Sequence, residues 1–235
     1  MAEERPMTII EHLEELRGRL VKCVIALAIT TAFSFTFTTQ ILRVLIAPAG
    51  IKPVFLRPTE MFMTYFQVAL LSGVILAMPV IVYQTVQFVL PGLKSSERTY
   101  LRIIVPGATF SFIVGVAFTY FIMLPFALRY LLTFGGNLVE AKWAIGEYIS
   151  FVTTLIFWAG AVFETPLIIY FLARLRIVSP QFLSKNRKFA ILIIAVTAAV
   201  ITPTPDPFNM MLVMVPLLLM FEVGVLLAKL AYRPA

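Results

Sequence analysis

Long apolar segments constrain this chain more than any other feature of its sequence. Most of them are long enough to cross the hydrocarbon of a bilayer, which takes about 20 residues of helix. Of the 235 residues, 60% are hydrophobic, whereas soluble domains are about 45–50% apolar. A single soluble core cannot bury that excess, so we expect lipid to cover part of the surface. The predicted spans are 20–41, 66–90, 103–125, 148–171, 189–202 and 208–227.

The sequence therefore predicts an all-α integral membrane protein with one six-span domain over 1–235, in which the last two spans are short. The fifth span has 14 residues. As a helix it would be about 21 Å long, against about 30 Å of hydrocarbon. We expect this part of the protein to thin the membrane or to lie low in it. The proline-rich turn at 203–207 cannot continue the helix, so the chain must reverse there.

The distribution of positive charge predicts the orientation. The formal net charge is +7, and 14 of the 19 lysines and arginines fall in the segments assigned to one side of the membrane, both termini included. Because lysine and arginine are retained on the cytoplasmic side, we expect both termini in the cytoplasm and the protein in the cytoplasmic (inner) membrane. Residues 1–19 form an amphipathic pattern that predicts a cytoplasmic surface helix bending into the first span. The simpler alternative is that the first helix extends into water.

Two loops are predicted on the outer side, at about 42–65 and 126–147. The first contains Pro48, three further prolines or glycines, and several apolar residues. A loop of this composition packs on the protein instead of remaining extended, so we expect it to form an extracytoplasmic cap on the helices.

Glu164 lies in a run that is otherwise free of charge. An ionised carboxylate within a span costs about 2.5–3.5 kcal/mol on insertion scales, so a functional role is the default interpretation. The alternative is a protonated glutamate that joins two helices. Pro166 should kink the helix beside it and leave a polar notch. Gln84 and Gln87 are expected to face the same notch, although such residues more often only join helices.

The remaining polar residues have simpler interpretations when they are taken alone. Glu222 is expected to snorkel or to pair with a nearby base. From the residues alone, Glu15 is expected to form a local ion pair with Arg19, and Glu97 with Arg98 or Arg102. Surface pairs of this kind stabilise by only about 0–1 kcal/mol.

Several classes of function lack a signature in the sequence. It contains no phosphate-binding loop, no nucleophile with a partner base and no cluster of metal ligands. A single cysteine, Cys23, excludes an internal disulfide and a zinc site built on several thiolates. We therefore expect no enzymatic activity, no metal, no cofactor and no binding to nucleic acid.

Seven short motifs follow one another along nearly the whole chain. They are HLEELRGRL at 12–20, AP at 47–48, PVIVYQ at 79–84, FVLPGL at 88–93, ER at 97–98, FETP at 163–166 and TPTPD at 202–206. Each motif is weak alone, but the ordered set resembles the TatC family, the multispanning receptor of the twin-arginine protein translocase. The number of spans and the orientation agree with that resemblance.

The resemblance implies a receptor that binds signal peptides of folded cargo, whose n-region carries two adjacent arginines. It also implies assembly with single-span TatA- and TatB-type subunits, and export driven by the proton-motive force without nucleotide. By position, Glu15 and Glu97 would recognise the arginine pair, with Arg17 and Arg19 beside them. Residues with other implied roles are Glu164 with Gln84 as the intramembrane polar site, and Pro48 and Asp206 in assembly and the cap.

The chemistry of arginine agrees with this implied site. A guanidinium pairs with a carboxylate through two parallel hydrogen bonds that lysine cannot reproduce. The basic cytoplasmic face should repel a cationic peptide at long range, so recognition must act at short range. Arg17 and Arg19 have the alternative role of attracting anionic lipid headgroups. The alternative functions are a proton- or ion-coupled transporter that uses Glu164, a scaffold without a peptide site and, least favoured, an intramembrane hydrolase.

Overall fold

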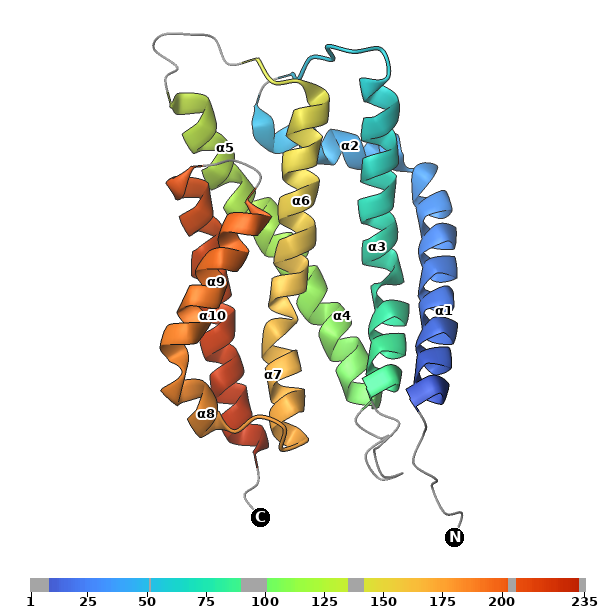
Figure 1. Cartoon of the computed structure of the whole chain (residues 1–235). Helices are drawn as coiled ribbons and strands as arrows, with labels where there is room; N and C mark the ends of the chain where they lie inside the picture. Colours follow the sequence, from blue (N-terminus) through green and yellow to red (C-terminus); the bar gives the residue numbers. More distant parts are fainter. Residues whose placement is uncertain (1–8, 51, 90–100, 135–141, 203–205, 233–235) are drawn as a thin grey trace.

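The protein is a bundle of helices in a computed structural model that describes residues 9–50, 52–89, 101–134, 142–202 and 206–232 (Figure 1). The described residues contain no strand, only an isolated parallel bridge between Val54 and Ala144. The helices are α1 (Ile9–Phe35), α2 (Thr38–Ile46), α3 (Glu60–Val89), α4 (Leu101–Phe118), α5 (Leu124–Thr133), α6 (Ile145–Phe163), α7 (Thr165–Arg174), α8 (Pro180–Lys185), α9 (Arg187–Ile201) and α10 (Pro207–Ala231).

Five stretches of helix among the described residues are long and apolar enough to cross a membrane. They are α1, α3, α4 continued through α5, α6 continued through α7, and α10. The prediction of an all-α protein with several apolar spans is therefore confirmed. α9 has 15 residues, which makes it about 22 Å long and shorter than the usual span.

The first helix differs from its prediction at both ends. α1 runs from Ile9 to Phe35 as one continuous helix, so it has no bend between an amphipathic segment and a span 20–41. After Phe35 the chain turns, and α2 lies across the end of the bundle (Figure 1). The turn is closed by the amides of Thr36 and Phe37, which donate to the carbonyls of Phe33 and Ser34. The apolar run continues through this turn, so hydrophobicity alone does not show where the helix ends.

The last helix corrects the expectation of two short final spans. α10 has 25 residues and is about 37 Å long, which is more than enough to cross the hydrocarbon. Asp206 begins it earlier than predicted, because its carboxylate accepts a hydrogen bond from the Asn209 amide at 2.8 Å and caps the first turn. Only α9 is short.

The third predicted span, 103–125, is part of a longer helix. A π-helical turn, Thr119–Met123, joins α4 to α5, which ends at Thr133. Pro125 at the start of α5 has no amide hydrogen and would clash with a carbonyl in a regular helix. The wider π turn, in which the Leu124 amide donates to the Thr119 carbonyl, absorbs the proline without ending the helix.

The core of the bundle surrounds α6, which Figure 1 shows between the other long helices. Twelve of the 19 residues of α6 are buried, whereas Ser34 alone is buried among the described side chains of α1. Fully buried side chains of α6 include Tyr148, Ile149, Val152 and Ile156. In contrast, α1 packs mainly on α3 at the edge of the bundle, so most of its surface remains available to lipid.

The first helix begins and the last helix ends at one end of the bundle, and α2 lies at the other. Figure 1 shows the start of α1 and the end of α10 at the same end of the bundle, which we call the terminal end. α2 and the segments before α3 and α6 gather at the opposite end, which we call the loop end.

A close crossing joins α1 to α3. The Thr30 hydroxyl donates a hydrogen bond of 2.8 Å to the Gly73 carbonyl. A Cβ atom placed on Gly73 would lie 2.8 Å from the Cα atom of Thr31, which is closer than two carbon atoms can pack. Glycine at this position therefore sets the distance between the two helices.

We predict that Gly73→Val separates α1 from α3 and lowers the free energy of unfolding by about 1–3 kcal/mol, the usual cost of overpacking. Thermal unfolding of the purified protein in detergent measures the change. Gly18→Ala in α1 is the matched control, because a Cβ atom there meets nothing within 4 Å. Equal effects of the two substitutions would show that the crossing is not close-packed.

Candidate functional site

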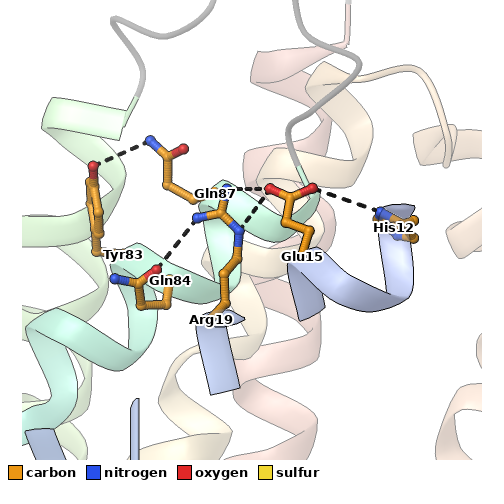
Figure 2. A network of polar contacts seen from close by, with 6 residues as sticks. All are labelled: His12, Glu15, Arg19, Tyr83, Gln84 and Gln87. Atoms are coloured by element: carbon orange, nitrogen blue, oxygen red, sulfur yellow. Dashed lines mark hydrogen bonds and ion pairs between the residues drawn. The ribbon is translucent and has the colours of Figure 1, made fainter. Parts of the chain in front are cut away.

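A cluster of polar and aromatic side chains joins α1 to α3 at the terminal end of the bundle (Figure 2). We call it the α1–α3 cluster and define it as His12, Glu15, Arg19, Gln84 and Phe88. The three residues from α1 are spaced by three and four positions, so they share one face of the helix, and the two from α3 are spaced by four. Two helical faces therefore meet along this contact.

The ion pair between Glu15 and Arg19 is the centre of the cluster. Nε of Arg19 donates to Oε1 of Glu15 at 2.9 Å, and Nη2 donates to the same oxygen. Each side chain is only 20% exposed, so the pair is better shielded from water than an ordinary surface pair. The local ion pair predicted for these two residues is confirmed.

Gln84 extends this pair to the second helix. Its Oε1 accepts a hydrogen bond of 3.4 Å from Nη1 of Arg19. The guanidinium thus contacts α1 through Nε and Nη2 and α3 through Nη1. Gln84 was expected to face Glu164, but it faces Arg19 instead, and it does not line the cavity beside Glu164. Periodicity alone did not show which face of α3 turns toward α1.

The second oxygen of Glu15 is differently placed. Oε2 is buried and accepts no hydrogen bond from any residue that the structure describes. Nδ1 of His12 lies 4.0 Å away, within ion-pair range but too far for a hydrogen bond. An anionic oxygen buried without a donor is costly, so Oε2 has unused capacity to accept a hydrogen bond.

His12 and Phe88 border the same carboxylate. Their rings stack with centroids 4.4 Å apart and planes 14° from parallel. Next to them on α3, the Gln87 amide lies 3.5 Å from the Tyr83 hydroxyl, as Figure 2 shows. Sequence reasoning missed the role of His12 and Phe88. The spacing of His12, three residues before Glu15, was the available signal.

Arg17 and Glu97 were also predicted for this site. Arg17 is exposed on α1. Glu97 lies outside the residues that the structure describes, between Val89 at the end of α3 and Leu101 at the start of α4. The structure therefore does not test a pairing of Glu15 with Glu97.

Glu164 lies at a break between α6 and α7. Pro166 has no amide hydrogen, and the Leu167 amide donates to the Glu164 carbonyl at 3.0 Å, one residue closer than in a regular helix. The Phe163 carbonyl is thereby left without its usual helical donor, and the Ser111 hydroxyl donates to it at 2.6 Å. The predicted kink and its polar notch are present, and a serine of α4 satisfies the freed carbonyl.

The Glu164 side chain is 8% exposed, and its Oε1 is buried without a hydrogen bond from a described residue. It borders a cavity of about 330 Å³ between α3, α4 and α7. The other lining residues are apolar apart from Thr85. A carboxylate facing such walls is suited to hydrogen-bond with a polar group that enters from the membrane.

At the loop end, tyrosine hydroxyls hold α2 against the bundle. Tyr148 donates to the Leu45 carbonyl at 2.7 Å, and Tyr120 donates to the Val44 carbonyl at 2.9 Å. Pro48 follows directly, in the 3₁₀ turn Ala47–Ala49, and is half-buried. These contacts give the segment around Pro48 a defined position.

Glu60, the first residue of α3, joins the two loop segments to each other. Its Oε1 accepts a hydrogen bond of 2.7 Å from the Gly146 amide at the start of α6, and its Oε2 accepts from the amides of Leu56 and Arg57 at 2.7 and 3.2 Å. One carboxylate thus satisfies three backbone donors from two segments about 90 residues apart. Sequence reasoning did not identify Glu60, because a glutamate at the start of a helix is common.

A pair of charged residues connects α9 to α10. Nη2 of Arg187 donates to Oε2 of Glu222 at 2.7 Å, and both side chains are 48% exposed. The expected pairing of Glu222 with a nearby base is confirmed. Within the described ranges, no group of three or more histidine, cysteine, aspartate or glutamate side chains is arranged to hold a metal ion.

Comparisons with known proteins agree with one another. Residues 11–216 match the model of the Sec-independent protein translocase protein family, TatC. The protein of that name from Carboxydothermus hydrogenoformans is 40% identical over 230 residues, which are 97% of this chain and 95% of the relative. The chloroplastic TATC of Arabidopsis thaliana is 35% identical over 236 residues, 99% of this chain and 69% of the relative.

The fold has a solved counterpart. A crystal structure of the twin arginine translocase receptor TatC superposes on this chain with a TM-score of 0.85 at 36% sequence identity. The match covers 95% of this chain and 100% of that one. The relation therefore extends over nearly the whole chain.

We predict that Glu60→Gln loosens the loop end and lowers the unfolding temperature by several degrees. Glutamine keeps one oxygen and replaces the other with an amide group that cannot accept, so either the Gly146 amide or the Leu56 and Arg57 amides lose their partner. Hydrogen exchange at these three amides should quicken on the side that is lost.

Glu147→Gln is the matched control, because Glu147 lies in the first turn of α6 with its side chain exposed. This control removes one negative charge at the same end of the bundle. A similar fall in unfolding temperature for both variants would contradict the role of Glu60.

Proposed function

Because the chain belongs to the TatC family of Sec-independent protein translocase proteins, we propose that it is the membrane receptor for twin-arginine signal peptides of folded cargo. It is a multi-pass membrane protein of protein transport, and the relatives are translocase components and not catalysts. The alternative of a proton-coupled transporter is not favoured, because the proteins that it matches are named as protein translocases.

One observation carries the proposal: a shielded carboxylate at the terminal end has one oxygen that no described residue satisfies. An arginine guanidinium presents planar pairs of N–H donors to such an oxygen, whereas a lysine presents a point charge. A hydrogen bond between charged partners is roughly twice as strong as one between neutral groups. Glu15 therefore has the chemistry of an arginine receptor.

Glu97 is the proposed second acceptor, because two adjacent arginines need two carboxylates. The ends of the flanking helices, Val89 of α3 and Leu101 of α4, lie at the same end of the bundle as Glu15 (Figure 1). This arrangement supports a site to which both acids contribute. Arg19 belongs to this site through its pair with Glu15. Arg17 is exposed two residues away, on another side of α1, where it suits anionic lipid headgroups.

The proposed orientation places the terminal end in the cytoplasm and the loop end outside, as an extracytoplasmic cap that includes Pro48. Fourteen of the 19 lysines and arginines lie in segments assigned to the terminal end, and cytoplasmic segments retain positive charge. The membrane is then the cytoplasmic (inner) membrane. A signal peptide emerging in the cytoplasm would meet the α1–α3 cluster first.

We further propose that α9 is a sixth span. Its 15 residues reach about 22 Å, so the bilayer beside it must thin. The pair between Arg187 and Glu222 ties its first turn to α10, and Asp206 caps α10 where the chain returns. Both contacts suit a compact helical hairpin.

The proposed partners are single-span subunits of the TatA and TatB type. In this proposal Glu164 is the intramembrane polar site, because its free oxygen borders a cavity among apolar walls. Pro48 and Asp206, which lie at the loop end, support assembly from the other side. No nucleic acid, cofactor or nucleotide enters the mechanism, and the proton-motive force drives export.

The basic terminal end requires that recognition act at short range. A net positive surface repels a cationic peptide, and at physiological salt this repulsion is largely screened beyond about 8–10 Å. Close contacts must therefore supply the affinity, from the Glu15 carboxylate to the arginines and from apolar groups to the hydrophobic part of the peptide.

We predict that Glu15→Ala and Glu97→Ala each weaken binding of a twin-arginine signal peptide by at least about tenfold, since each removes a charge-assisted contact. Titration of a labelled peptide against the purified protein measures the affinity. Crosslinking from positions beside Glu15 and Glu97 locates the peptide. In cells, export of twin-arginine cargo should stop when this protein is removed.

Glu14→Ala is the matched control, because Glu14 is an exposed acid beside Glu15. A peptide in which two lysines replace the two arginines is the second control. Unchanged binding in the Glu15→Ala and Glu97→Ala double variant would remove the proposed site, and equal binding of the two peptides would remove the proposed function.

A further inference from the structure

We propose that Arg19, held by Gln84, is a positioning residue that turns the Glu15 carboxylate so that its Oε2 alone receives the arginine of the ligand. This inference rests on the proposed function and deepens it. It assigns separate roles to two arginines at one carboxylate: a resident one that orients Glu15 and an incoming one that is recognised.

Arg19 contacts both Glu15 on its own helix and Gln84 on α3. Three of its nitrogens are engaged, with Nε and Nη2 on Oε1 of Glu15 and Nη1 on Gln84. The planar guanidinium therefore spans the two helices and cannot leave Glu15 without also breaking its contact with α3. A guanidinium that is bonded on two sides in this way orients the Glu15 carboxylate and is not displaced from it by a ligand.

The two oxygens of the Glu15 carboxylate differ in the donors that they receive. Each carboxylate oxygen has two lone pairs. Those of Oε1 are occupied by the two donors from Arg19, and those of Oε2 receive no donor from a described residue. Because Oε2 is buried in this structure, the groups that cover it must move aside before a ligand guanidinium can place two N–H groups on it, in the same way as Arg19 does on Oε1. A lysine ammonium group cannot present two donors in one plane. The two unoccupied lone pairs of Oε2 therefore favour arginine over lysine.

The charges of Glu15 and Arg19 cancel within the α1–α3 cluster. Arg19 already neutralises Glu15, so the site offers an incoming cation little net attraction. Selectivity must then come from the direction of the free lone pairs, which Arg19 and Gln84 determine. His12, stacked on Phe88 with Nδ1 4.0 Å from Oε2, borders this acceptor on the side away from Arg19.

The experiment compares Arg19→Gln, Arg19→Lys and Gln84→Leu in the full chain, by titration with a twin-arginine peptide and its twin-lysine counterpart. For Arg19→Gln we expect affinity for the arginine peptide to fall about tenfold. Affinity for the lysine peptide should stay the same or rise, because the carboxylate left without Arg19 attracts any cation. Arg19→Lys keeps the charge but not the planar donors, and should lose nearly as much. Gln84→Leu leaves the ion pair but frees Nη1, and should lose about threefold.

A double-mutant cycle separates positioning from general damage to the fold. In a Glu15→Gln background, Arg19→Gln should have little further effect, because both substitutions act through the same carboxylate. Lys22→Gln is the matched control, since it removes an exposed positive charge from the same helix. Thermal unfolding identifies any variant that fails to fold, and Gln84→Leu tests the same idea without altering charge.

The outcomes are distinct. If the unaltered protein does not distinguish the two peptides, the proposed function fails. If it does distinguish them, but Arg19→Gln leaves the affinity unchanged or increases it, only the positioning role is overturned. An increase would show that the resident guanidinium competes with the ligand. Equal losses for the arginine and lysine peptides would also overturn it, because that is the effect of a merely structural residue.

Discussion

In a hydrocarbon solvent every backbone donor and acceptor must find a partner inside the protein, and this requirement determines the whole architecture. It explains why the described chain is helical. It also explains why, wherever a helix is interrupted, the backbone groups left without helical partners are satisfied in another way. Ser111 satisfies the carbonyl of Phe163 beside Pro166. A π turn accommodates Pro125, and the Glu60 carboxylate gathers three amides at the loop end. In each case the hydrogen-bond partner is a residue that lies next to the break in the helix.

Among the residues that the structure describes, two acidic side chains have a buried oxygen that receives no hydrogen bond, and both have proposed roles. Glu15 has one oxygen bound by Arg19 and one unsatisfied by described residues, and Glu164 also has one unsatisfied oxygen. The first lies at the terminal end, where the proposed signal peptide would bind, and the second borders a cavity among apolar walls. The hydroxyls of Thr31 and Ser34 are also buried without a hydrogen bond from a described residue. A buried carboxylate oxygen without a donor is costlier than a hydroxyl, so the two carboxylates are where we expect other molecules to contribute donors.

The sequence predicted the class of fold, most spans and the ion pair between Glu15 and Arg19, because these depend on apolar length and on spacing within one helix. It missed the turn after Phe35, since the apolar run continues through it. It also assigned Gln84 to Glu164, because spacing along α3 does not show which neighbour each face meets. The stacking of His12 on Phe88 and the bond from the Gly146 amide to Glu60 were missed for the same reason, because the two partners of each contact lie far apart in the sequence. Glu97 lies outside the described residues and stays a prediction.

The attachment of α1 to a single neighbour has a mechanical consequence. Thr30, at the crossing with Gly73, is fifteen residues from Glu15, or about 22 Å along the helix. A tilt of about 5° at that crossing therefore displaces the carboxylate by about 2 Å, most of the length of a hydrogen bond. Pro79 lies in α3 between the two contacts with α1, where it weakens the helix against bending. Lateral forces from the surrounding lipid on α1 would thus act directly on the geometry of the proposed peptide site.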